Sequence, residues 1–260
     1  MKMLEVEGVT QRFGGLIAVN DVDFYIDEKE IVSLIGPNGA GKTTLFNVIA
    51  GTYIPSAGSI KFNGEEIANL SSSAVANKGI IRTFQITSLF GGCSVLESLM
   101  IAQHINLKAN FLDVLLNNKK VRREEADALE RCEEILKLIG LEEKSKLISE
   151  NLSYGDQRLL EIGIALSAEP QMLLLDEPAA GLNETETEDL MALICTLRDK
   201  GITIFLVEHD MNLVMNVSDR VLVLANGVKI CEGLPKEVVN HPEVINAYLG
   251  TDGTDKEIDG

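Results

Sequence analysis

A glycine-rich segment near the start of the chain carries residues suited to binding phosphate. It fits the pattern G-x-x-x-x-G-K-[ST] with the residues Gly36, Pro37, Asn38, Gly39, Ala40, Gly41, Lys42 and Thr43, and Thr44 follows. Glycines let such a loop curl so that its N–H groups point at a phosphate chain. The Lys42 ammonium can reach the β- and γ-phosphates, and the Thr43 hydroxyl can ligate Mg²⁺. The segment therefore predicts a nucleotide site.

Two acidic residues follow a wholly apolar run later in the chain. The run extends from Met172 to Leu175, and Asp176 and Glu177 come directly after it. A carboxylate at a strand end can hold the Mg²⁺ shell through water, and its neighbour can polarise a water toward a γ-phosphate. Alone, such a pair would more often be a solvated strand end. Given the phosphate-binding loop, we expect Asp176 to serve the metal and Glu177 to act as catalytic base.

Strands and helices must position these residues. The β-branched run 31–35 predicts a strand before the loop, and 42–50 predicts the helix after it. The apolar runs 172–175 and 202–207 are typical of buried parallel strands, with a helix that opens at Asn183 between them. This alternation of strand and helix predicts an α/β fold. Strands at 220–224 and 228–231 follow on either side of Asn226-Gly227.

The rest of the chain divides into a β part and a helical part. Residues 1–30 and 59–62 alternate apolar and polar around turn residues, which predicts an antiparallel β subdomain. An inserted helical subdomain is expected at about 87–165, including an amphipathic helix over 121–139 with Ala128, Cys132, Ile135 and Ile139 on its inner face. We expect one domain over 1–250 and an acidic, disordered tail at 251–260.

A short motif upstream of the acidic pair points to a family. It reads Leu152, Ser153, Tyr154, Gly155, Asp156 and Gln157, and a helix to about Ser167 is expected after it. Here the chain resembles the ATP-binding cassette ATPases, from residue 3 to about 250. In that family the signature, usually L-S-G-G-Q, contacts the γ-phosphate of ATP on the opposite subunit. The resemblance implies this role for Ser153 and Gly155, and a hydroxyl, an N–H and a helix N-terminus suit an anion. Tyr154 and Asp156 depart from the usual pattern.

The resemblance also implies catalytic and metal-binding roles for two isolated residues. Gln85 corresponds to the glutamine of the Mg²⁺ and water shell, so that Thr43, Gln85 and Asp176 together would hold the metal. His209 follows the strand at 202–207, where the family places a histidine that contacts the γ-phosphate. The family's cofactors are ATP and Mg²⁺.

Two further positions have open alternatives. Phe13 falls where the family stacks an aromatic ring on adenine, and a position in the core is the alternative. Asn183 lies in the loop that crosses the dimer interface of the family, and it can serve as an interface contact, as a helix cap, or as both.

The combination of motifs is similar to the ATPase subunits of high-affinity branched-chain amino-acid importers. The gap between Gln85 and Leu152 is long, and the chain also has the segment Glu208-His209-Asp210-Met211 and the ending Tyr248-Leu249-Gly250. The resemblance implies two transmembrane permease subunits, a second ATPase subunit and, indirectly, a solute-binding protein as partners. The apolar residues beside Gln85 are expected to line part of the permease-docking groove, with a buried hinge as the alternative: Phe84, Ile86, Leu89 and Phe90.

Three other functions would account for parts of this pattern. Urea and short-amide importers share much of the pattern, and the ATPase does not touch the cargo. A cassette ATPase that works outside transport would usually have two cassettes, a coiled coil or a basic surface, whereas this chain has one cassette and a net charge of −17. A small-molecule kinase would leave the signature and His209 without a role.

Composition limits where such a protein works. The chain has 23 Lys and Arg against 40 Asp and Glu, a net charge of −17, which disfavours a nucleic-acid partner. Neither a secretory signal nor an apolar run of about 20 residues is present in the sequence, so we expect a cytoplasmic protein held peripherally on the inner face of the cell membrane by other chains. The four cysteines are widely spaced, and we expect reduced core thiols.

Overall fold

The computed structural model describes residues 1–83, 92–106 and 119–249. The strands are β1 (Lys2–Phe13), β2 (Leu16–Asp27), β3 (Ile31–Ile35), β4 (Ala57–Phe62), β5 (Glu65–Glu66), β6 (Ile80–Arg82), β7 (Met172–Asp176), β8 (Thr203–Val207), β9 (Arg220–Ala225) and β10 (Val228–Gly233). The helices are α1 (Lys42–Ile49), α2 (Ser72–Asn77), α3 (Val95–Asn106), α5 (Lys119–Leu138), α6 (Tyr154–Leu166), α7 (Glu184–Asp199), α8 (Met211–Val217), α9 (Pro235–Val239) and α10 (Pro242–Leu249), with 3-10 turns η1 (Glu142–Lys144) and η2 (Ser149–Asn151).

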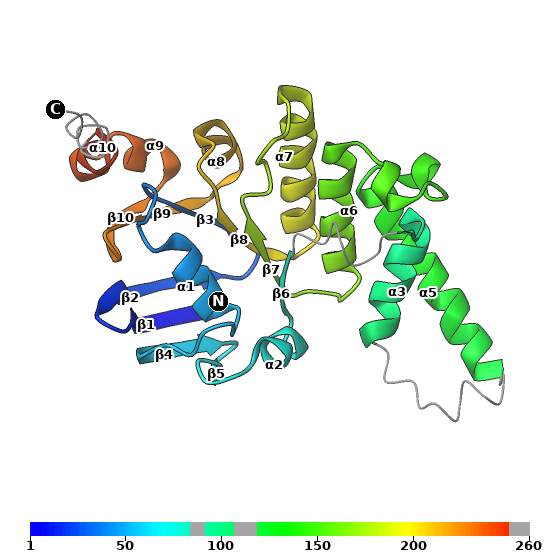
Figure 1. The fold of residues 1–260 in the computed structure, drawn as a ribbon, viewed down its shortest axis with the longest axis horizontal. Helices are drawn as coiled ribbons and strands as arrows, with labels where there is room; N and C mark the ends of the chain where they lie inside the picture. Colours follow the sequence, from blue (N-terminus) through cyan, green and yellow to red (C-terminus); the bar gives the residue numbers. More distant parts are fainter. Residues whose placement is uncertain (84–91, 107–118, 250–260) are drawn as a thin grey trace. The chain divides into compact units, whose positions relative to one another are not determined.

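The chain forms two compact units, labelled by their elements in Figure 1. The first contains residues 1–82, 171–180 and 187 onward, and the second contains residues 83–170 and 181–186. The ten strands found in the described residues belong to the first unit, and α3, α5 and α6 belong to the second.

Two sheets build the first unit. One has the strand order β2-β1-β4-β5 with antiparallel pairing, and the other has the order β10-β9-β3-β8-β7-β6. In the second sheet the pairs from β9 to β6 are parallel and only β10 is antiparallel. The strands β3 and β8 are buried throughout, as expected for a sheet covered on both faces.

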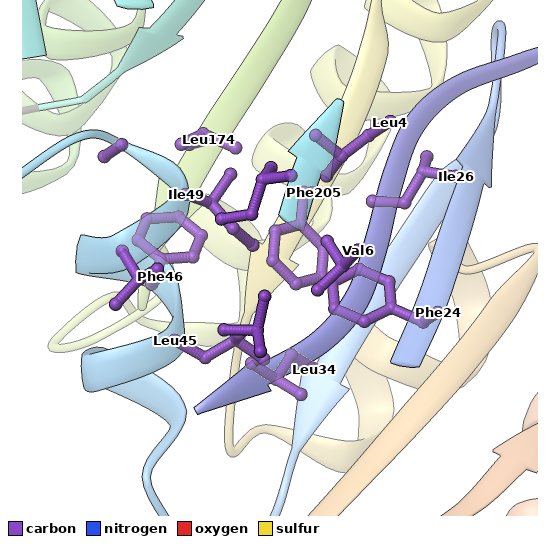
Figure 2. Packing of buried hydrophobic residues seen from close by; sticks show 14 of the residues in the cluster. Leu4, Val6, Phe24, Ile26, Leu34, Leu45, Phe46, Ile49, Leu174 and Phe205 are labelled. Atoms are coloured by element: carbon purple, nitrogen blue, oxygen red, sulfur yellow. The ribbon is translucent and has the colours of Figure 1, made fainter. Parts of the chain in front are cut away.

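A hydrophobic core joins the two sheets and α1. Figure 2 shows the ring of Phe205, on β8, among side chains from β1, β2 and α1. Its centroid lies 5.6 Å from that of Phe24 and 5.7 Å from that of Phe46. Because Phe46 is on the helix that follows the phosphate-binding loop, this packing fixes that helix against the parallel sheet.

The second unit is helical. Among residues 126–139, the buried side chains are Ala128, Cys132, Leu136 and Ile139, whereas Ile135 is only half-buried. A Cβ on Gly163 of α6 would lie 2.7 Å from the Ile139 side chain, so glycine is what lets α6 approach at this point.

The structure confirms most of the expected elements. The antiparallel β part, the strand–loop–helix around the glycine-rich segment and the strands at 172–175 and 202–207 all form, which confirms the expected α/β class. All four cysteines are free, but only Cys132 is buried, so the expectation that all four are core thiols was wrong for Cys93, Cys195 and Cys231. Among the described residues, no helix is both long and apolar enough to span a bilayer. The expected tail at 251–260 lies outside the described residues.

Candidate functional site

The glycine-rich loop connects the end of β3 to the start of α1. Its shape depends on positions where a side chain would collide with backbone: a Cβ on Gly36 would lie 2.1 Å from the Leu224 carbonyl oxygen, and one on Gly41 would lie 2.3 Å from that of Ala18. Gly39 has a φ of 77°. Asn38 and Gly39 are exposed at the tip of the loop, where a phosphate chain could reach their backbone.

The Lys42 side chain lies along the inside of this loop. Its ammonium donates to the carbonyl oxygens of Gly36, at 2.6 Å, and Pro37, at 3.1 Å. Burial lowers the pKa of this ammonium, while the carboxylates of Glu177 and Asp176 act to raise it. A buried cation with two neutral acceptors is well placed to bind an anion that enters the loop.

The acidic pair lies at the end of β7. This strand is separated from β3 by β8 alone, so the loop and the carboxylates share one edge of the parallel sheet. Asp176 Oδ2 accepts a hydrogen bond from Arg82 Nη2 at 2.8 Å, and Arg82 Nη1 donates to Asn47 of α1. The Thr43 hydroxyl is on the same helix, on an exposed residue.

Glu177 and His209 come from neighbouring strand ends. His209 Nδ1 lies 3.9 Å from Glu177 Oε1, and both side chains are exposed. Glu177 has a φ of 46°, a left-handed conformation that is uncommon for this residue type. Its N–H donates to the Val207 carbonyl at 2.9 Å, which ties the residue to the end of β8.

Glu208 holds the two strand ends together. Its side chain is fully buried, and its carboxylate accepts hydrogen bonds from the N–H groups of Ala179 at 2.9 Å and His209 at 2.9 Å. An acid directly after the apolar run 202–207 was the available signal for this role, but nothing in the sequence identifies Ala179 as its partner.

Phe13 lies at the end of β1, in the turn to β2. It is 42% exposed, so the alternative of a core position is wrong. Its ring packs edge-to-face on Tyr53, with centroids 5.3 Å apart and planes at 79°. The pair presents an aromatic surface to which a planar base could stack.

Another residue that sequence reasoning did not assign to the loop is Tyr248, on α10. It packs against the cluster that contains Ile35, the residue before the loop. Burial raises the pKa of the Tyr248 phenol, while a hydrogen bond with the Gly36 backbone acts to lower it. The C-terminal helix thus reaches the first residue of the loop.

The signature segment belongs to the second unit and opens α6. Ser153 is the N-cap residue, and its Oγ accepts a hydrogen bond from the Asp156 N–H at 3.1 Å. A Cβ on Gly155 would lie 2.5 Å from the Glu186 carboxylate, and one on Gly181 would lie 3.0 Å from the Tyr154 ring. Segment 181–186 therefore packs directly against the signature.

The Asn183 alternatives are resolved in part. Its Oδ1 accepts a hydrogen bond from the Glu186 N–H at 3.0 Å, and the Glu186 carboxylate accepts one from the Asn183 N–H at 3.0 Å. This reciprocal pair is a capping box at the start of α7, so the expected cap is confirmed.

Gln85 lies outside the described residues, as does the expected docking groove of Phe84, Ile86, Leu89 and Phe90. Within the part of the chain that the structure describes, no group of three or more His, Cys, Asp or Glu side chains could hold a metal ion. A hydroxyl and one carboxylate fit Mg²⁺, which is commonly held by few protein oxygens plus substrate phosphates.

Comparisons with known proteins agree with this geometry. Residues 19–180 match a family described as ABC transporter, and residues 228–254 match one described as branched-chain amino acid ATP-binding cassette transporter. The chain is similar to the high-affinity branched-chain amino acid transport ATP-binding proteins BraF of Pseudomonas aeruginosa and LivG of Escherichia coli (strain K12). Each is 47% identical over 249 residues, which cover 95% of this chain and 98% of the relative.

Solved structures lead to the same fold. The ADP conformation of an ATP-binding cassette of an ABC transporter has a TM-score of 0.85 and 33% identity, and covers 96% of this chain and 99% of its own. A nucleotide-free cassette has a TM-score of 0.84 and 32% identity, and covers 95% and 99%. The nucleotide-binding fold expected from the sequence is therefore confirmed.

Proposed function

Because the chain belongs to the ABC transporter family of ATPases, we propose that it is the ATP-hydrolysing subunit of an importer for branched-chain amino acids. The proposed cargo rests on one observation: the chain is 47% identical, along nearly its whole length, to proteins named for branched-chain amino acid transport. The match at 228–254 supports the same choice. Urea and short amides are less favoured cargoes, because these relatives are named for branched-chain amino acid transport.

ATP would bind in the first unit. The loop from Gly36 to Gly41 would surround the β- and γ-phosphates with N–H groups, and the Lys42 ammonium would exchange its two carbonyl partners for phosphate oxygens. Thr44 follows in the first turn of α1, where the helix N-terminus adds positive potential. Phe13, supported by Tyr53, would stack on the adenine.

Mg²⁺ would be held by Thr43, Asp176 and Gln85 together with the phosphates. When bound, the ion would neutralise the charge that develops on the phosphate oxygens. Arg82 orients Asp176 by holding one of its carboxylate oxygens. Glu208 fixes the loops after β7 and β8, so that Glu177 and His209 keep their spacing.

Hydrolysis requires a base and a group that holds the γ-phosphate. Glu177 would accept a proton from the attacking water, and its exposed carboxylate leaves room for that water. His209, 3.9 Å away, would contact the γ-phosphate and keep the water and the base in line. Neither side chain is locked into a hydrogen bond with the other at that distance.

The chain would act with partners. In the proposed assembly, a second ATPase subunit pairs head to tail with this one, so that Ser153 and Gly155 close over ATP held by the paired loop. Two transmembrane permease subunits would hold the pair peripherally at the inner face of the membrane, and a solute-binding protein would deliver the amino acid.

Reconstitution of the complex in liposomes tests this proposal. We expect ATP-dependent uptake of leucine, isoleucine and valine, and loss of both uptake and hydrolysis in Glu177→Gln, with a stable ATP-bound dimer. Uptake of urea without branched-chain amino acids would overturn the cargo. Wild-type turnover in Glu177→Gln would overturn the role of Glu177.

A further inference from the structure

The signature segment carries an acid where a neutral glutamine is usual. Asp156 lies in the first turn of α6, three residues after the N-cap Ser153, and its side chain is only 15% exposed. Its own N–H donates to Ser153 Oγ at 3.1 Å. The carboxylate is therefore fixed beside the hydroxyl and the helix N-terminus that would receive phosphate.

One cation reaches this carboxylate from outside the helix. Lys144, the last residue of η1, places its Nζ 2.6 Å from Asp156 Oδ2. Burial acts to raise the pKa of the Asp156 carboxyl, but hydrogen bonds with Lys144 and Ser153 outweigh it and hold the pKa below its ordinary value. Asp156 is thus a carboxylate at neutral pH.

The positive N-terminus of α6 and the negative Asp156 carboxylate have opposite effects on an approaching phosphate. A helix N-terminus carries the equivalent of about half a positive charge, which an adjacent carboxylate more than cancels. A γ-phosphate that approaches Ser153 and Gly155 would meet net negative charge if Asp156 stood alone. The Lys144 ammonium is hydrogen-bonded to that carboxylate. With it, the summed charge of the helix N-terminus, the carboxylate and the ammonium is positive again.

We propose that Lys144 is a positioning residue of the signature: it pins and neutralises Asp156 so that Ser153 and Gly155 can accept the γ-phosphate of ATP bound to a paired subunit. This inference rests on the proposed function, since it needs a second subunit. Lys144 acts through Asp156, with which it is paired.

Four variants of the full-length chain in the Glu177→Gln background test this role. They are Lys144→Ala, Asp156→Gln, the double variant, and Arg131→Ala as a matched control. Arg131 pairs with Glu169, beyond the opposite end of α6, at 3.9 Å. The readout is the ATP concentration that gives half-maximal dimer, measured by sedimentation in the presence of Mg²⁺ and, where the pair is a heterodimer, with the second ATPase subunit.

We expect Lys144→Ala to raise that concentration about tenfold, which corresponds to about 1.4 kcal/mol. Arg131→Ala should stay within about twofold of the parent, Asp156→Gln should not raise the concentration, and the double variant should return to within about twofold of the parent because no uncompensated carboxylate is left. Binding of a fluorescent ATP analogue to the monomer should be unchanged in all four. The rescue separates this role from a purely structural one.

Two results would overturn the inference alone. One is a Lys144→Ala protein that dimerises like the parent, and the other is a double variant as weak as Lys144→Ala, which would mean that Lys144 supports the fold and not the charge balance. A parent that forms no ATP-dependent dimer with itself or its paired subunit would instead overturn the proposed function and, with it, this inference.

Discussion

The guanidinium of Arg82 lies 2.8 Å from the carboxylate of Asp176, although 94 positions separate the two residues. Arg82 also hydrogen-bonds Asn47 and lies over the ring of Phe46, 5.2 Å from its centroid. One side chain at the end of β6 therefore joins the helix after the phosphate-binding loop to the strand that carries the metal-binding acid. Both members of the ion pair are mostly shielded from solvent.

Loss of this guanidinium should destabilise the first unit. We expect Arg82→Met to lower the free energy of unfolding by about 1–3 kcal/mol, because Asp176 loses its partner in a half-buried place. Arg82→Lys should recover only part of the lost free energy of unfolding, since an ammonium cannot bond Asp176 and Asn47 in the same fork geometry. Urea denaturation followed by circular dichroism measures both. Lys61→Met, which breaks the exposed pair with Glu7, is the control and should cost less than about 0.5 kcal/mol.

A methyl group at Gly36 should be far more harmful than one at another glycine with positive φ. Its Cβ would lie 2.1 Å from the Leu224 carbonyl oxygen, so β9 or the loop must move. We expect Gly36→Ala to cost more than about 3 kcal/mol or to prevent folding. Gly14, with a φ of 59° and open space around it, is the control, and Gly14→Ala should cost only about 1–2 kcal/mol. Equal urea midpoints for the two variants would contradict the close approach.

Phe13 should contribute to base binding and not to phosphate binding. Phe13→Ala is expected to weaken ATP about five- to tenfold, the value of one aromatic stack, while Phe13→Tyr keeps the affinity. Tripolyphosphate, which has no base, should bind both variants equally well in a competition assay. Leu16→Ala removes an exposed apolar side chain paired with Phe13 across the same turn and is the control. A matching loss for tripolyphosphate would mean that Phe13 shapes the loop.

Short motifs could be located from the sequence because residues a few positions apart are also close together in the folded chain. The loop from Gly36 to Thr43 curls by its own glycines, and the strand patterns before it and before Asp176 indicate which sheet they join. The capping box of Asn183 and Glu186 is likewise local, three residues apart. Such features need no knowledge of long-range contacts.

Partners distant in the chain could not be found in this way. The Arg82–Asp176 pair depends on β6 lying beside β7, and the contact between Lys144 and Asp156 depends on how η1 meets α6. Phe13 comes directly before the turn residues Gly14 and Gly15, but only the fold reveals that its ring is exposed and packs on Tyr53. The partial burial of Cys195 likewise depends on how far α7 turns it from the core.

Lys42 should be needed for phosphate binding but not for the fold. Lys42→Met keeps a side chain of similar length and removes an ammonium whose acceptors are two carbonyl oxygens. We expect ATP affinity to fall at least about a hundredfold, as for loss of a buried charge-assisted contact. Thermal unfolding without nucleotide should change little, because the desolvation cost of the ammonium is lost together with its hydrogen bonds. Unchanged ATP affinity would remove Lys42 from the site.

The pH dependence of stability should reveal the burial of Lys42 directly. Burial lowers the pKa of this ammonium in the folded protein below its ordinary value of 10.5, so between the two values the unfolded chain binds more protons. Stability rises with pH wherever that holds. The wild type should therefore gain free energy of unfolding relative to Lys42→Met as pH rises from neutral toward 10.5, since the other lysines are common to both proteins and cancel. Urea denaturation of the two proteins across this range gives the difference between their free energies of unfolding. If wild type minus Lys42→Met stays constant or falls as the pH rises, the folded state does not disfavour the charged form of Lys42.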